Sequence, residues 1–98
     1  MIIYIAGPMS GLPDNNYPAF NAEAARLRAQ GYEVRNPAEG PECFSWSDYM
    51  RMSIRQLVTC DTIRLLHGWE ESSGAMLEVY IADRLGMRFF YPQQEVTP

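Results

Sequence analysis

The chain has 98 residues, 47% of them hydrophobic, and its 8 basic and 12 acidic side chains give a net charge of −4. This is the length of one small domain, so residues 1–98 are expected to form a single unit. The acidic balance argues against a nucleic-acid polymer or an anionic membrane as the main partner, because both require a basic face.

The first predicted element is a strand over Ile2 to Ala6, a continuous apolar run that Gly7 and Pro8 end. No basic residues precede this run as in a signal peptide, and no apolar run approaches the ~18 residues of a membrane span, so a cytoplasmic location is expected. A helix should begin near Tyr17, with Asn16 as its cap. In chain order, the predicted elements are a strand at 2–6, a helix from about 17 to 30, a strand at 32–35, a helix from about 46 to 60, a strand at 62–66, a helix from about 73 to 85 and a strand at 88–91.

This regular alternation predicts an α/β fold, a Rossmann- or flavodoxin-like three-layer sandwich with a short parallel sheet of about four strands. In such sheets, ligands bind beyond the carboxyl ends of the strands, at the topological switch point. The rule brings together the loops after the first and second strands and the loop before the third helix. Arg64 interrupts the third strand, so that strand is either partly exposed or carries a paired arginine.

Glu78 is a carboxylate on what should be an apolar helix face. Its neighbours three and four residues away are Gly74, Ala75, Ile81 and Ala82. Carboxylates on such faces are rarely buried unless they are paired or functional. The simpler alternative is a glutamate near the start of a helix, favoured by the helix dipole. If the face is dry, desolvation should raise the pKa of Glu78, and a hydrogen bond to the ionised carboxylate would oppose this.

Two loops of small residues are candidates for ligand binding. Glycines let the backbone approach a ligand, successive N–H groups can cradle an anion, and a helix N-terminus favours phosphate or carboxylate. A plain structural turn for the first loop and simple N-capping for the serines of the second are the alternatives. The two loops are Gly7-Pro8-Met9-Ser10-Gly11 and Ser72-Ser73-Gly74.

Other side chains carry weaker signals. His67 has no visible Ser or Cys partner and favours a structural role, while Cys43 and Cys60 lack metal-site or disulfide spacing. No metal and no cofactor are therefore expected. A stacking wall for a planar base could be formed by aromatic residues that belong equally often to a core, namely Phe44, Trp46, Tyr49 and Trp69.

Motifs along nearly the whole chain resemble those of one family. They are Tyr4 to Gly11, Asn16 to Asn21, Asn36 to Glu39, and Gly68 to Glu70 with Ser72, Gly74, Ala75 and Glu78. The family is DUF4406, small domains of unknown function found often in bacteriophage and prophage genomes. It is similar to the nucleoside 2-deoxyribosyltransferases and the 2′-deoxynucleoside 5′-phosphate N-hydrolases. The resemblance implies cleavage or transfer at the N-glycosidic bond of a (deoxy)nucleoside or its 5′-monophosphate.

The resemblance also implies roles for particular residues. The glutamate matching Glu78 is the nucleophile that attacks C1′ of deoxyribose, and the tyrosine matching Tyr4 positions it. The segment matching Pro8 to Gly11 contacts the sugar or its 5′-phosphate. A serine matching Ser72 contacts that phosphate in the hydrolases, whereas the transferases carry an acid there, so Ser72 tilts the resemblance towards a nucleotide.

One position departs from the pattern of these enzymes. They carry an aspartate on the second helix that protonates or holds the departing base, and Ser53 occupies the matching position. A serine is not a general acid at neutral pH, and losing such help costs about 10²–10⁴-fold in rate. A catalytically weak or inactive nucleotide-binding or sensor module is therefore the alternative function.

The third predicted helix is apolar nearly all round, through Met76, Leu77, Val79, Tyr80, Ile81 and Leu85. Such a helix is usually buried on two sides, and only one side can face its own sheet. A homodimer or a higher homo-oligomer is expected, as the resemblance also implies. The contact should involve Tyr49, Met50 or Met52 from the second helix and Tyr80 or Arg84 from the third.

Overall fold

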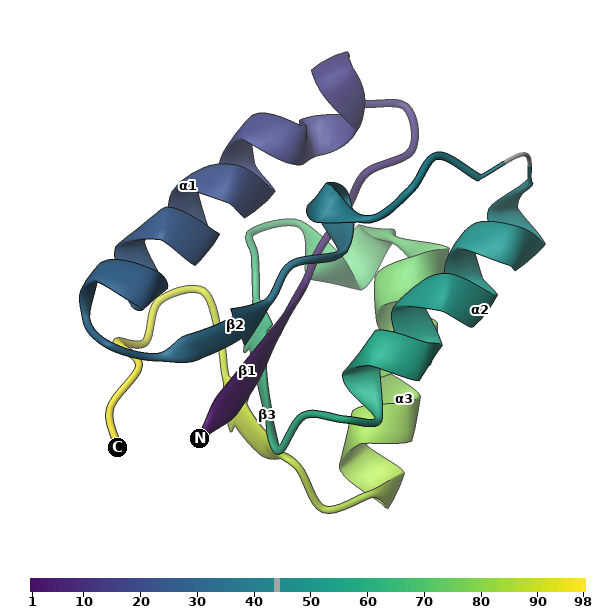
Figure 1. Ribbon diagram of the computed structural model, residues 1–98. Helices are drawn as coiled ribbons and strands as arrows, with labels where there is room; N and C mark the ends of the chain where they lie inside the picture. Colours follow the sequence, from purple (N-terminus) through teal and green to yellow (C-terminus); the bar gives the residue numbers. More distant parts are fainter. Residues whose placement is uncertain (44) are drawn as a thin grey trace.

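The computed structural model describes residues 1–43 and 45–98, which form a parallel four-stranded sheet between two layers of helices (Figure 1). The strand order is β2-β1-β3-β4. This architecture confirms the predicted α/β, flavodoxin-like fold. The strands are β1 (Ile2–Ala6), β2 (Glu33–Arg35), β3 (Thr62–Leu65) and β4 (Arg88–Phe90). The helices are α1 (Tyr17–Ala29), α2 (Trp46–Leu57) and α3 (Ser73–Arg84), with short 3₁₀ turns η1 (Pro13–Asn16), η2 (Pro37–Glu39) and η3 (Trp69–Glu71).

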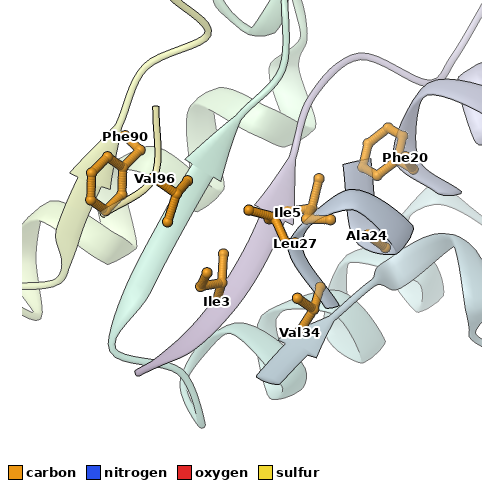
Figure 2. Packing of buried hydrophobic residues seen from close by; sticks show 8 residues of the cluster. All are labelled: Ile3, Ile5, Phe20, Ala24, Leu27, Val34, Phe90 and Val96. Carbon is orange, nitrogen blue, oxygen red and sulfur yellow. The ribbon is translucent and has the colours of Figure 1, made fainter. Parts of the chain in front are cut away.

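Strand β1 directs alternate side chains to opposite faces of the sheet, as the pleat requires. Ile3 and Ile5 enter the core beneath α1, where Figure 2 shows them beside Leu27 and Val34. Tyr4 and Ala6 enter the other core, which α2 and α3 cover. A tyrosine of the central strand is therefore placed directly beneath the two helices that follow β2 and β3.

Arg64 is paired, and β3 is buried along its whole length. The residue is 7% exposed, and its Nε donates to the Glu23 carboxylate of α1 at 2.8 Å. One terminal nitrogen also donates to the carbonyl oxygens of Tyr91 and Gln94. Arg64 thereby connects α1, β3 and the C-terminal segment. Val96 of that segment packs in the core beneath α1, together with Ile3 and Ile5.

Two helix ends differ from the sequence prediction. Asn16 is at the N-cap position of α1 but has a left-handed backbone, with φ 59°, and makes no capping bond. Its side-chain amide donates instead to the carbonyl of Pro8 at 2.9 Å, which fastens the loop after β1. Helix α2 ends at Leu57 rather than near Cys60, because the Thr59 hydroxyl and the Cys60 amide turn back onto carbonyls of the last helical turn.

Candidate functional site

A cavity of about 540 Å³ lies at the carboxyl edge of the sheet, where the chain passes from one helical layer to the other. This is the switch-point location at which open α/β sheets bind ligands. Three segments supply most of its wall: the loop after β1, the first half of α2 and the start of α3. The lining from these segments comprises residues 7–10, Ser45, Trp46, Tyr49, Met50, residues 71–75 and Glu78.

Glu78 and Tyr4 form a buried pair at the base of this cavity. Glu78 is on α3 and is 5% exposed, and Tyr4 of β1 is fully buried. The Tyr4 hydroxyl donates a hydrogen bond to Oε2 of Glu78. Glu78 lines the cavity and Tyr4 does not. The tyrosine therefore contacts the carboxylate from within the protein core and leaves the cavity free for a ligand.

The surroundings of the pair shift the pKa values of both side chains. Burial raises the pKa of Glu78 to about 7, although the hydrogen bond from Tyr4 and the nearby Ser53 hydroxyl favour the ionised form. Burial and the neighbouring Glu78 charge raise the pKa of Tyr4 well above its ordinary value. Near neutral pH the Tyr4 phenol therefore keeps its proton and can donate a hydrogen bond, and Glu78 is ionised in a large share of the protein molecules.

Ser53, on α2, belongs to the same buried group. It is fully buried, and its hydroxyl donates to the carbonyl of Met50 at 3.2 Å. The hydroxyl also lies close enough to Glu78 and Tyr4 to lower the pKa of both. A neutral serine here leaves Glu78 without an acidic neighbour on α2, and it cannot supply a proton at neutral pH.

Small residues bring the walls of the cavity together. A Cβ on Gly74 would meet the Met50 sulfur at 3.1 Å, so glycine allows the start of α3 to lie against α2. A Cβ on Gly7 would meet the Leu66 Cβ at 2.8 Å, so glycine is required where β1 ends. Both glycines therefore have a packing role, and both also line the cavity.

The two serines at the start of α3 are partly committed to the helix, Ser72 as its N-cap and Ser73 as its first residue. The Ser72 Oγ accepts a hydrogen bond from the Ala75 amide at 3.1 Å, which is an N-cap. Ser72 and Ser73 nevertheless line the cavity at the positive end of the α3 dipole. Capping and ligand contact are compatible here, since the capping oxygen keeps its own proton to donate.

The structure brings most of the predicted site residues to one cavity and leaves three outside its lining. Residues 7–10, 72–74 and Glu78 line it, but Tyr4, Gly11 and Trp69 do not. Gly11 has a φ of +82° and serves a turn. Trp69 contacts the second core and lies 6.0 Å from the Tyr91 ring, centroid to centroid. Of the predicted stacking wall, Trp46 and Tyr49 line the cavity and Phe44 lies outside the described residues.

Several lining residues were not predicted from the sequence. Tyr17 and Phe20 come from the start of α1, and Pro37 from the turn after β2. The switch-point rule places the loop after β2 at this edge of the sheet, so it could have predicted that Pro37 lines the cavity. The pattern of α1 gave none, because Phe20 is spaced as an ordinary core residue of that helix.

The described part of the lining is acidic. It contains Glu42, Glu71 and Glu78 and neither lysine nor arginine. Among residues 1–43 and 45–98, no three His, Cys, Asp or Glu side chains gather as a metal site would require. Within the same residues, every helix is too short or too polar to cross a membrane.

Comparisons with known proteins identify a solved structure with a similar fold and a family for this chain. A solved structure named 2-desoxiribosyltransferase from Leishmania mexicana superposes with a TM-score of 0.72 at 23% sequence identity. The match covers 92% of this chain but only 62% of that one, and it shows the fold. No curated protein matches. The model described as Domain of unknown function (DUF4406) matches residues 1–91, and the chain therefore belongs to the DUF4406 family.

Proposed function

We propose that this protein cleaves the N-glycosidic bond of a nucleoside, with Glu78 as the nucleophile and Tyr4 as the residue that positions it. The observation that carries the proposal is a buried carboxylate on a cavity wall, held from behind by a buried tyrosine hydroxyl. A structural carboxylate would be expected to pair with a cation or to face water. The fold shared with a 2-desoxiribosyltransferase supports the same chemistry.

In the proposed reaction, a Glu78 oxygen bonds to C1′ while the C1′–N bond breaks and its electron pair leaves with the base. The oxocarbenium-like transition state is stabilised by the adjacent carboxylate, as in retaining glycosidases. The base takes a proton from water. A water molecule then attacks C1′, releases the sugar and restores the Glu78 carboxylate; attack by a second base would instead give transfer.

The charge of the cavity favours an uncharged nucleoside over its 5′-monophosphate. A phosphate would enter a lining whose described residues hold three carboxylates and no basic side chain. The α3 N-terminus and its serines offer the main anion-stabilising groups, and the Ser72 oxygen already accepts a bond from the helix. Glu71, directly before these serines, would repel a phosphate bound there.

Ser53 favours a second candidate function, a nucleoside-binding module without turnover. Its side chain is buried beside Glu78 and cannot protonate a departing base. Such a module would use the same cavity and would bind the nucleoside intact.

One experiment separates these functions. The protein is incubated with a panel of deoxynucleosides, ribonucleosides and their 5′-monophosphates, and free base is measured by chromatography. Wild type should release base from a deoxynucleoside, Glu78→Gln should not, and Glu33→Gln, at an exposed carboxylate of β2, should behave as wild type. Saturable binding without release would support the binding module, and neither binding nor release would reject both functions.

A further inference from the structure

Tyr49 is a second proton-bearing side chain that faces the cavity with Glu78. It lies on α2, is half-buried, and lines the cavity opposite the start of α3. Its hydroxyl donates to the sulfur of Met9, in the loop after β1, with an O–S distance of 2.9 Å. Resting on the function proposed above, we infer that the Tyr49 hydroxyl donates a hydrogen bond to the departing base.

The hydrogen bonds of the buried group single out this hydroxyl. Tyr4 already donates to Glu78, and Ser53 already donates to the Met50 carbonyl. Tyr49 instead donates to a thioether, which is a weak acceptor. A ring nitrogen or carbonyl oxygen of a base is a stronger acceptor, so the exchange from sulfur to ligand is favourable. The Tyr49 hydroxyl is therefore the donor of this group that can most readily turn to a ligand.

The position of Tyr49 suits a contact with the base more than with the nucleophile. Tyr49 and Ser53 are four residues apart, so they lie on one face of α2. Ser53 is buried beside Glu78, while Tyr49 is one turn closer to the helix N-terminus, where Trp46 also lines the cavity. A nucleoside whose C1′ meets Glu78 can therefore extend its base along α2 towards these two aromatic side chains.

The role needs no proton loss from tyrosine. When the C1′–N bond breaks, its electron pair stays on the base, and negative charge develops on the base nitrogens and oxygens. Burial and the nearby Glu78 charge raise the pKa of Tyr49, so the phenol keeps its proton and stabilises that charge as a hydrogen-bond donor. The base receives its proton from water, and Tyr49 ends the cycle unchanged.

Tyr49→Phe tests this role, because it removes the hydroxyl and keeps the ring. The kcat and KM values are measured for deoxynucleosides whose bases differ in leaving-group acidity. The variant should lose about 10- to 100-fold in kcat with the poorest leaving bases and much less with the best, since a hydrogen bond to a charged group has that value. KM should rise by much less than kcat falls, because the hydrogen bond strengthens as negative charge develops on the base. Tyr32→Phe, which removes a hydroxyl near Val96 outside the cavity, is the matched control and should behave as wild type.

Each other outcome has a definite meaning. Equal losses across all bases, or an increase in KM alone, would show a packing or binding role and overturn the inference. Glu78-dependent base release that Tyr49→Phe leaves unchanged would also overturn it while the proposed function stands. Absence of base release by wild type would reject the proposed function and this role together. Circular dichroism of both variants checks that they fold.

Discussion

Glu78 has a pKa of about 7 because burial removes its carboxyl group from water, and in the proposed reaction only the ionised form attacks C1′. The Tyr4 hydroxyl opposes this effect by donating to the ionised form. The two residues thus set the fraction of protein that is ready to react at a given pH. At the residue scale, the proposed activity is linked to one titration.

The first prediction follows from this titration. The value of kcat/KM should rise with pH and level off above about 7, as Glu78 loses its proton. Tyr4→Phe should move the midpoint to higher pH and lower the plateau, because the ionised carboxylate loses its donor. The measurement is base release from pH 4 to 9 for both proteins. A wild-type midpoint near the ordinary glutamate value of 4.5 would contradict the account.

The same carboxyl group should reduce stability at alkaline pH. Its folded-state pKa exceeds the value of 4.5 expected in the unfolded chain, so between the two values the folded state binds more protons. Stability is therefore lost as pH rises through this window to about 7. Glu78→Gln, which has no charge to bury, should be more stable than wild type at pH 8 by about 1–3 kcal/mol. Urea denaturation should show that this advantage shrinks at pH 5, and an advantage that is independent of pH would contradict the prediction.

At the element scale, β3 and α1 are joined through a buried ion pair rather than through apolar contacts alone. The side chains of Arg64 and Glu23 are 9% and 12% exposed, and the arginine also holds the carbonyl oxygens of the C-terminal segment. A buried cation that loses its carboxylate costs far more than an exposed one. This pair should therefore contribute to the docking of α1 and of the segment that carries Val96.

Two substitutions compare the contribution of this buried ion pair to stability with that of an exposed ion pair. Glu23→Gln should lower the free energy of unfolding by about 2–4 kcal/mol. Arg64 would stay buried with only neutral acceptors, and Arg26, which also pairs with Glu23 at 2.8 Å, would lose its carboxylate too. Glu39→Gln removes a carboxylate from the exposed pair with Arg28, whose side chains are 41% and 49% exposed, and should cost about 0–1 kcal/mol. Urea denaturation compares both with wild type, and equal losses would show that burial of the Arg64 pair adds nothing.

The elements themselves were largely predictable, because apolar runs and helical spacing alternate without interruption. The apolar neighbours of Glu78 also indicated its burial, and the family resemblance suggested its contact with Tyr4; the structure has both features. It did not reveal that Asn16 would fasten a loop instead of capping α1, since both roles use the same side chain. Nor did it place Trp69 against Tyr91, because that contact joins segments far apart in the chain.

At the scale of the whole molecule, α3 and β4 present an uncovered apolar surface. Tyr80 is 64% exposed and Leu77 is 38% exposed, and a groove between the two elements includes Val79 and Phe89. Met50 is buried at 4% exposure, which moves the expected subunit contact away from it and towards α3. We propose that this surface joins two copies of the chain, since two-fold homodimers are the commonest soluble assembly.

Light scattering tests the proposed dimer. Wild type should have a mass near twice that of the 11.2 kDa chain at tens of micromolar concentration. Tyr80→Glu should shift the protein towards monomer, because it would bury an unpaired charge in the contact. Leu12→Glu, at a residue with 42% exposure between β1 and α1, should leave the mass unchanged. A monomeric wild type would contradict the prediction.

The central claim is that Glu78 bonds to C1′, and intact-protein mass spectrometry tests it most directly. A 2′-fluoro-2′-deoxynucleoside slows both steps, because fluorine destabilises the oxocarbenium-like transition state, and a good leaving base restores the first. After incubation and acid quench, wild type should gain the mass of one fluorosugar, on the peptide that contains Glu78, and Glu78→Gln should gain none. Release of base with no added mass, or the same adduct on Glu78→Gln, would contradict the account.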